Sequence, residues 1–229
     1  MQETFKPFKV SLVYESNNAK MKIPDSILSA AFELFMNFGV RSVSMDDIAQ
    51  KLGISKKTIY ASVQTKEDLI LQVIGSFLKL EESNIRNITS ASSNAIDEII
   101  NINRHILSYL RVMKPSLIFD LKKYYPECWN MIEQTHLNFI REVIEKNILR
   151  GQSEGLYRHD LLPKVISKLF ITKSLMIIDE KEFSLVRNDL YELIMQLEKY
   201  HLYGIVSPAG QEKLLHQYNS TPLQKISND

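Results

Sequence analysis

Cysteine is almost missing from this chain of 229 residues, which contains only Cys128. An intramolecular disulfide and a cysteine-rich zinc site are therefore both excluded. Such low cysteine usage fits a reducing compartment, and we expect a cytoplasmic protein. Glycine and proline are also scarce, with seven of each. Because an all-β fold needs frequent turns, this scarcity argues against that class.

Long apolar runs and an excess of one charge are missing as well. No stretch of 18 apolar residues occurs, so we expect no membrane span, and the N-terminus lacks the apolar core of a signal peptide. The formal net charge is +1. Any binding of nucleic acid must therefore come from local placement of charge rather than from bulk basicity.

The first twenty residues form a polar lead-in without helical periodicity. Helical order begins immediately after Met21, which makes Met21 a candidate translation start. We therefore expect residues 1–20 to be an N-terminal extension, either disordered or absent from the natural protein.

From Pro24 onward, apolar residues recur at helical spacing, and this predicts an all-α fold. A first helix has one apolar face and ends at Gly39; the face consists of Ile27, Leu28, Ala31, Leu34, Phe35 and Phe38. Ser44 begins a second helix, whose buried stripe is Met45, Ile48, Ala49 and Leu52. Ser55 begins a short third helix that reaches Val63, and Thr65 begins a fourth.

The rest of the chain also reads as helices. Residues 89–94, rich in serine and threonine, are the best candidate for a linker. Helices are expected from residue 95 to near Pro115 and over 116–124, 126–155, 160–180, 185–203 and 208–218. We expect an N-terminal three-helix domain over 21–80 and a larger helical-bundle domain over 81–229.

Two short helices separated by a glycine turn, residues 44–52 and 55–63, form a helix-turn-helix pattern. Ala49 is small where the helices cross, Gly53 makes the bend, and Ile54 and Ile59 pack the second helix against the first. The exposed part of the second helix then carries short polar and basic residues that can approach a major-groove floor. These are Lys56, Lys57, Thr58, Tyr60, Ala61 and Ser62.

Residues 22–78 resemble the DNA-binding domain of the TetR family of repressors. The matching positions are Ile27, Leu28, Ala30, Ala31, Leu34, Phe35, Gly39, Met45 to Ala49, Leu52 to Lys56, Thr58 to Tyr60, Lys66, Glu67 and Leu69. The family usually has an aromatic residue followed by phenylalanine near positions 61–63, where this chain has the smaller Ser62 and Val63.

The resemblance implies a role for each matching position. Thr58 and Tyr60 contact phosphates, Lys56 and Lys57 contact bases or phosphates, Lys66 contacts a phosphate at the start of the next helix, and Ser44 adds a DNA-backbone contact. It also implies a ligand-responsive homodimer, most simply a repressor, on a palindromic DNA operator. Two plainer interpretations compete: Lys56 and Lys57 form a solvated face, and Tyr60 belongs to the core.

In the remaining residues, two late helices carry more apolar positions than one buried face needs. We expect a dimer interface there, formed by Leu162, Val165, Ile166, Leu169, Leu190, Leu193, Ile194 and Leu197. A pocket for a hydrophobic or aromatic effector is expected among Tyr109, Met113, Phe119, Trp129, Ile132, His136, Phe139 and Phe170. The alternative is that these aromatic residues and Met113 simply fill the core.

An enzyme is the competing functional class. Glu133/His136 and Glu198/His201 both have the Glu-x-x-His spacing of di-iron carboxylate bundles. The sequence contains no Gly-x-Ser-x-Gly elbow, no phosphate-binding glycine loop and no His-Glu-x-x-His motif. We therefore expect a regulator rather than an enzyme, with no catalytic residue, metal or cofactor.

Overall fold

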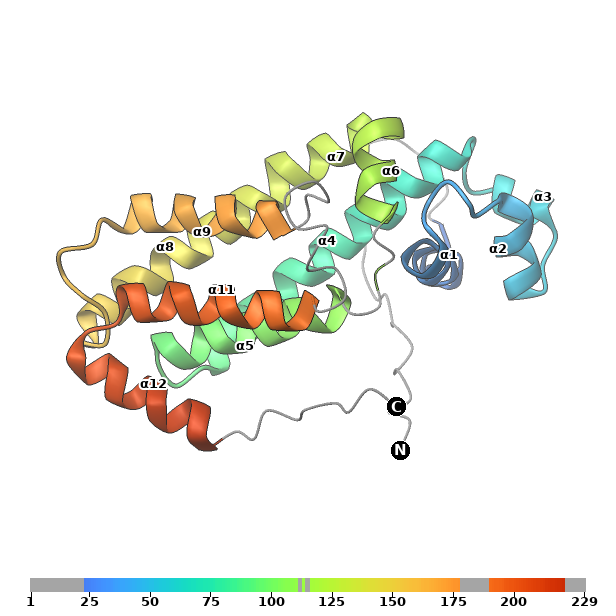
Figure 1. Ribbon diagram of the computed structural model, residues 1–229. Coiled ribbons are helices and arrows are strands. Elements are labelled where there is room, and N and C mark those ends of the chain that lie inside the picture. Colours follow the sequence, from blue (N-terminus) through green and yellow to red (C-terminus); the bar gives the residue numbers. More distant parts are fainter. Residues whose placement is uncertain (1–22, 111–112, 114–115, 178–189, 221–229) are drawn as a thin grey trace. The chain divides into compact units, whose positions relative to one another are not determined.

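The computed structural model describes residues 23–110, 113, 116–177 and 190–220 (Figure 1). These residues form helices joined by turns, and their one isolated antiparallel bridge pairs Tyr157 with Val206. The expected all-α fold is confirmed. The expected N-terminal extension, residues 1–20, lies outside the described residues. None of the described helices is both long and apolar enough to span a bilayer.

The chain divides into two compact units. The first comprises the residues up to Arg86 together with 112–138, and the second comprises 87–111 together with the residues from Phe139 onward. The second stretch of the first unit, 112–138, lies far along the chain from the first. The boundary expected near residue 80 separates two functional domains rather than two groups of contacting residues, and it stays a prediction.

The first unit contains the short N-terminal helices and a later helical segment. Its elements are α1 (Asp25–Phe38), α2 (Met45–Leu52), α3 (Lys56–Tyr60), most of α4 (Lys66–Ala91), α6 (Ser116–Tyr124), α7 (Pro126–Met131) and the π-helix η1 (Ile132–Leu137). The apolar face predicted for α1 is buried except at two positions: Leu34, within the helix, is only half-buried, and Phe38, its last residue, is 56% exposed. The prediction for Phe38 was wrong because this last helical residue lies beyond the packed part of the face.

The second unit is a group of longer helices. It contains the end of α4, α5 (Ala95–Leu110), α8 (Asn138–Ser153) from Phe139 onward, α9 (Pro163–Ile177), α11 (Leu190–Ile205) and α12 (Pro208–Ser220). Figure 1 shows α11 running beside both α5 and α9, in agreement with their contacts. Ser207 caps α12, because its Oγ accepts a hydrogen bond from the Gly210 N–H at 3.1 Å.

One expected boundary is wrong, and one expected helix contains a segment that was not predicted. Helix α4 continues to Ala91, so half of the expected linker at 89–94 is helical. Its hydroxyl groups do not break the helix because they bond to carbonyls within it: Ser90 Oγ donates to Asn87 and Ser92 Oγ donates to Ile88. The helix expected over 126–155 is present without interruption from Pro126 to Ser153, and its middle is π-helical, so it consists of α7, η1 and α8 in direct succession.

Buried polar contacts hold the second unit together around the start of α5. The Tyr157 side chain is fully buried, and its hydroxyl donates to the Ala95 carbonyl at 3.0 Å. Arg150 of α8 reaches the Glu98 carboxylate at 3.0 Å and the Ser92 carbonyl at 3.0 Å. Burial raises the pKa of Glu98, while the Arg150 guanidinium acts in the opposite direction. These bonds connect the α4–α5 turn to the end of α8.

Cys128 is buried in the first unit, on α7. Burial, followed by the nearby Glu127 carboxylate, raises the pKa of its thiol to about 11. The thiol is therefore protonated and unreactive at neutral pH.

Candidate DNA-binding site

Helix α2 begins with a capping box that fixes its N-terminal turn. Ser44 Oγ accepts from the Asp47 N–H at 3.2 Å, and Asp47 Oδ2 accepts from the Ser44 N–H at 2.7 Å. The hydrogen bonds from Ser44 lower the pKa of Asp47. Ile48 and Ala49 of this helix are buried against the unit core, whereas Leu52 is only half-buried. The predicted cap is confirmed.

The turn between α2 and α3 depends on the left-handed backbone of Gly53. Gly53 has φ +64° and ψ +29°, a conformation that side chains disfavour. Its N–H donates to the Gln50 carbonyl at 3.2 Å, and the Ile54 N–H donates to the Ala49 carbonyl at 3.0 Å. This pair of bonds is a Schellman motif, which ends α2 and directs the chain into α3.

Helix α3, the expected recognition helix, is short and is held at both ends. Ser55 Oγ accepts from the Thr58 N–H at 3.1 Å and lies 2.9 Å from the Thr58 hydroxyl. Ile59 is fully buried and anchors the helix to the unit core. The helix ends at Tyr60, earlier than the expected Val63, which is buried in the following turn.

The exposed face of α3 carries the residues predicted to meet DNA. Lys56, Lys57, Thr58 and Ala61 are exposed, Ser62 is half-buried, and Tyr60 is 43% exposed. Tyr60 is therefore not a pure core residue. Lys56 Nζ pairs with Asp46 Oδ2 at 2.7 Å, and this hydrogen bond raises the pKa of Lys56. Among the described residues, Lys57 has no ion-pair partner, so its ammonium group is available to an anion.

Lys66, at the start of α4, has an interior partner that the sequence did not indicate. Its Nζ donates to the Val40 carbonyl at 2.7 Å, across 26 residues of chain. Burial lowers the pKa of Lys66. Thr65 caps the same helix, since its Oγ1 accepts from the Asp68 N–H at 3.0 Å while Asp68 Oδ2 accepts from the Thr65 N–H at 3.2 Å. Lys66 therefore joins α4 to the loop after α1.

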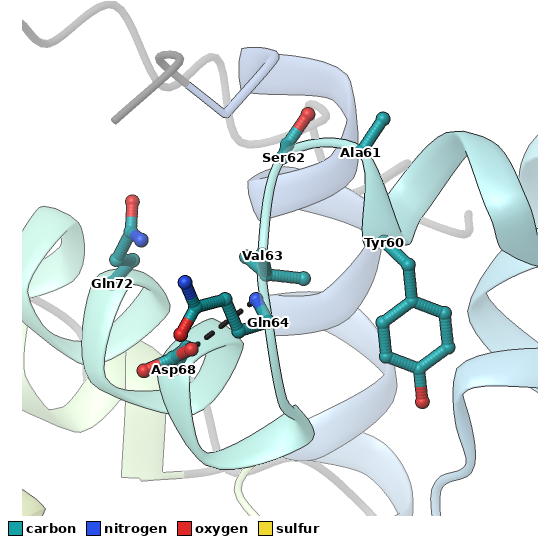
Figure 2. Close-up of a pocket in the computed structure, with 7 residues that line it drawn as sticks. All are labelled: Tyr60, Ala61, Ser62, Val63, Gln64, Asp68 and Gln72. Carbon is teal, nitrogen blue, oxygen red and sulfur yellow. Dashed lines mark hydrogen bonds between the residues drawn. The ribbon is translucent and has the colours of Figure 1, made fainter. Parts of the chain in front are cut away.

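A small hollow of about 120 Å³ lies where α3 turns into α4. It is lined by Tyr60, Ala61, Ser62, Val63, Gln64, Asp68 and Gln72. Figure 2 shows the side chains of Gln64, Asp68 and Gln72 gathered on one side, with the ring of Tyr60 pointing away from them. The small Ala61 and Ser62 border this hollow.

Helix α6 packs on the loop that follows α1, a contact that local sequence patterns did not predict. The Arg41 N–H donates to Asp120 Oδ2 at 3.2 Å, and the Arg41 guanidinium lies 4.6 Å from the centre of the Tyr124 ring. Gly39 has φ +82°, and a Cβ there would lie 2.9 Å from Ser116 Oγ. The loop that leads into α2 is therefore held by residues about 80 positions later in the chain.

The eight residues expected to line an effector pocket divide between the two units. Tyr109, Phe139 and Phe170 belong to the second unit, and Met113, Phe119, Trp129, Ile132 and His136 belong to the first. Phe139 and Phe170 are buried, whereas Phe119 is 48% exposed under the ammonium group of Lys123. The side chain of His136 lies outside the described residues. The pocket stays a prediction.

The residues expected at a dimer interface differ in exposure. On α9 and just before it, Leu162, Val165 and Leu169 are 67%, 49% and 58% exposed, and Ile166 is partly buried. On α11, Leu193 and Leu197 are partly buried, while Ile194 packs with Leu107 in the core of its own unit. The side chain of Leu190 lies outside the described residues. The exposed apolar side chains thus lie on and just before α9.

As far as the structure describes them, the two Glu-x-x-His pairs of the metal-enzyme alternative do not have the surroundings of a di-iron site. Residues 132–137 form a π-helix, so Glu133 and His136 do not have the α-helical geometry that a Glu-x-x-His pair needs. Glu198 Oε2 accepts from Asn103 Nδ2 at 2.8 Å. Within the described part of the chain, no group of three or more histidine, cysteine, aspartate and glutamate side chains is placed to hold a metal ion.

A capped α2, a Schellman turn and a capped α3 with exposed basic and hydroxyl groups make up a helix-turn-helix, a motif that DNA-binding proteins use. Residues 27–73 match the family model for bacterial regulatory proteins of the tetR family. The chain is 28% identical over 117 residues to YvaF, an HTH-type transcriptional regulator of Bacillus subtilis. That alignment covers 51% of this chain and 59% of YvaF, so it spans a little over half of each protein.

Solved structures share the fold along most of the chain. A TetR-family regulator from Agrobacterium tumefaciens has a TM-score of 0.65 at 17% identity, covering 80% of this chain and 97% of its own. A transcriptional regulator from Saccharomonospora viridis, solved in complex with choline, has a TM-score of 0.62 at 18% identity, covering 80% and 96%. Residues 27–73 are thus similar to the tetR family of regulatory proteins, and the chain shares the overall fold of these solved transcriptional regulators.

Proposed function

We propose that this chain is a ligand-responsive repressor that binds a palindromic operator as a homodimer. The observation that carries the proposal is the exposed face of α3, with Lys57 unpaired among the described residues and Tyr60 43% exposed. A helix held this way presents fixed side chains to a major groove. The pairing of Lys56 with Asp46 is exposed, so DNA phosphates can replace the carboxylate at little cost.

The homodimer part of the proposal is supported by Leu162, Val165 and Leu169, three large apolar side chains exposed at and near the start of α9. Exposed apolar side chains in such a group favour contact with a partner surface. A two-fold dimer places two recognition helices about 34–36 Å apart, one DNA turn, so that both enter the major groove. Binding at both half-sites then multiplies affinity.

The ligand-responsive part of the proposal assigns the second unit to an effector. The Saccharomonospora viridis regulator was solved with choline, and for this chain we propose a small effector with a largely hydrophobic body. The effector lowers operator affinity by stabilising one arrangement of the dimer. The size of this change is limited by the difference between the effector's affinities for the two arrangements.

Fluorescence anisotropy on duplex DNA from upstream of the chain's own gene tests the DNA-binding proposal, run across a salt series. Lys57→Ala is expected to weaken binding and to reduce the salt slope by about 1, because one phosphate contact is lost. Tyr60→Ala is expected to weaken binding with no change of slope. Lys146→Ala, on the exposed side of α8 in the second unit, is the matched control and should bind like the wild type.

Lys66 is a poor probe of phosphate contact, because its removal also breaks the bond to Val40. If no upstream duplex binds selectively, a random-sequence selection supplies the operator. Equal binding of every duplex by the wild type and both variants after that selection would contradict the proposed function.

A further inference from the structure

Four polar side chains lie in the second unit where α11 packs against both α5 and α9. They are Asn103, Lys173, Glu198 and His201, the interior polar cluster. Asn103 is 9% and Glu198 4% exposed, and they are joined by the 2.8 Å hydrogen bond from Asn103 Nδ2 to Glu198 Oε2. Such buried polar groups are normally fully paired.

Lys173 and His201 approach the same aromatic ring. Lys173 Nζ lies 4.7 Å from the centre of the Phe170 ring and donates to the Leu197 carbonyl at 3.0 Å. The Phe170 and His201 rings meet edge to face at 5.0 Å. The Lys173 and His201 side chains are each partly exposed, unlike those of Asn103 and Glu198.

His201 leaves one hydrogen-bonding atom unused. Its Nε2 is buried and has no hydrogen-bond partner among the described residues. Burial, followed by the Lys173 ammonium group, lowers the pKa of His201 to about 3, so the imidazole is neutral at pH 7. A neutral imidazole nitrogen either donates or accepts one hydrogen bond, depending on its tautomer. Nε2 is therefore an open position for a polar partner.

The charges of the cluster select an uncharged partner. Lys173 is cationic below its pKa of about 8, and Glu198 is close enough to favour that cation. The Lys173 ammonium group and the Glu198 carboxylate offset each other's charge, so a charged ligand group would gain little net attraction there while losing its hydration on entry. A hydroxyl group both donates and accepts, so it satisfies either tautomer of His201 and accepts from Lys173.

The apolar side of the same helix pair continues directly from the cluster. Leu107 lies one turn after Asn103 on α5, and Ile194 lies one turn before Glu198 on α11. These two side chains form a buried group with Met195, against which Leu110 packs. A ligand held at the polar cluster would therefore lie next to apolar side chains.

We propose that the interior polar cluster is the polar end of the effector site and binds the hydroxyl group of an uncharged, largely apolar molecule. The proposal rests on the proposed function in one respect only, that the second unit responds to a ligand. It adds the residues that hold the ligand and the chemical class they select.

The test uses the full chain with 15N-labelled histidine, observed by NMR through the imidazole nitrogens. Four probes share one ring and differ in one group: benzyl alcohol, benzoate, benzylamine and toluene. Benzyl alcohol is expected to shift the Nε2 signal of His201, assigned by its loss in His201→Gln, with at least tenfold greater affinity than either charged probe. No shift with any probe, or equal shifts with the charged probes, would overturn the proposal and assign Nε2 to water.

Variants separate the hydroxyl contact from apolar packing. His201→Phe keeps a ring against Phe170 and removes both nitrogens, so benzyl alcohol is expected to lose its advantage over toluene. His159→Gln, at an exposed position, should leave that advantage unchanged. Equal preference for the alcohol in His201→Phe and wild type would overturn the proposal. Operator binding without any probe is measured separately, so a chain that fails to bind DNA but passes this test contradicts only the proposed function.

Discussion

Gly151, in the middle of the second unit, has no room for a side chain. A Cβ built on it would lie 2.0 Å from Cδ2 of Tyr157, 2.4 Å from its Cε2 and 2.5 Å from its Cγ. The ring cannot easily move away, because the Tyr157 hydroxyl is bonded to the Ala95 carbonyl and lies 3.2 Å from Asn147 Oδ1. One absent methyl group thus lets α8 and the following turn pack together.

Gly151→Ala is expected to lower the free energy of unfolding by about 1–3 kcal/mol, the usual cost of overpacking a well-filled core. Urea denaturation followed by circular dichroism measures the change. Gly204→Ala is the matched control: Gly204 is also helical, and a Cβ there meets nothing within 4 Å. That variant should be unchanged or more stable by up to about 1 kcal/mol, because alanine favours the helix. Equal effects at the two glycines would contradict the packing argument.

Acid sensitivity is expected from His201. Burial first, and Lys173 second, lower its pKa from 6.5 to about 3. Between these values the unfolded chain binds a proton that the folded chain does not, so stability falls as the pH drops from 6.5 towards 3. From pH 7 to pH 5, the contribution is about 2 kcal/mol.

Urea unfolding of wild type and His201→Phe at pH 7 and pH 5 measures this contribution. The wild type is expected to lose more stability on acidification than the variant, since phenylalanine does not titrate. Other groups titrate in both proteins and cancel in the comparison. Parallel losses in the two proteins would show that His201 is protonated in the folded state as readily as in the unfolded state.

Sequence predicted the roles of single residues only where the cause was local. The caps by Ser44 and Ser55 follow from a hydroxyl group placed three residues before the N–H that it bonds, so they were predictable. The bond from Lys66 to Val40 and that from Arg41 to Asp120 join residues 26 and 79 positions apart. No local pattern encodes such pairs, and the interior polar cluster escaped prediction for the same reason.

Among the elements, α3 depends most on its cap, because five residues form few internal hydrogen bonds. Ser55→Ala removes the acceptor for the Thr58 N–H, and we expect a loss of stability of about 1 kcal/mol together with weaker operator binding. Ser55→Asn restores a capping oxygen and should recover most of both. Thermal unfolding and anisotropy on the same samples measure the two effects. A variant series with unchanged binding would show that α3 is held by Ile59 alone.

Helix boundaries were predictable where a glycine, a proline or a cap marks them. Gly39 and Gly53 end α1 and α2, and Pro126 begins α7. The expected linker failed because Ser90 and Ser92 bond to helix carbonyls instead of breaking the helix. The π-helix at 132–137 was not predictable, since its wider turn does not change the residue types.

At the scale of the whole molecule, the exposed apolar side chains at the start of α9 test the homodimer. Leu169→Glu is expected to convert a dimer into a monomer in sedimentation velocity at about 10 µM and to weaken operator binding at least about tenfold, since two half-sites no longer bind together. Leu149→Glu, at a leucine that is 52% exposed on α8, is the control and should remain dimeric. A Leu169→Glu protein that stays dimeric and folded would place the interface elsewhere.

The buried thiol of Cys128 has a practical consequence for measuring the distance between the two copies of the proposed homodimer. Because it is the chain's one cysteine and its pKa is about 11, a maleimide dye at neutral pH leaves it unlabelled. A cysteine introduced at exposed Lys146, on α8, then becomes the one reactive site in each copy, with the native sequence otherwise untouched. Energy transfer between two such dyes reports the separation of the copies on the operator, and its change on adding an effector, without prior removal of a native thiol.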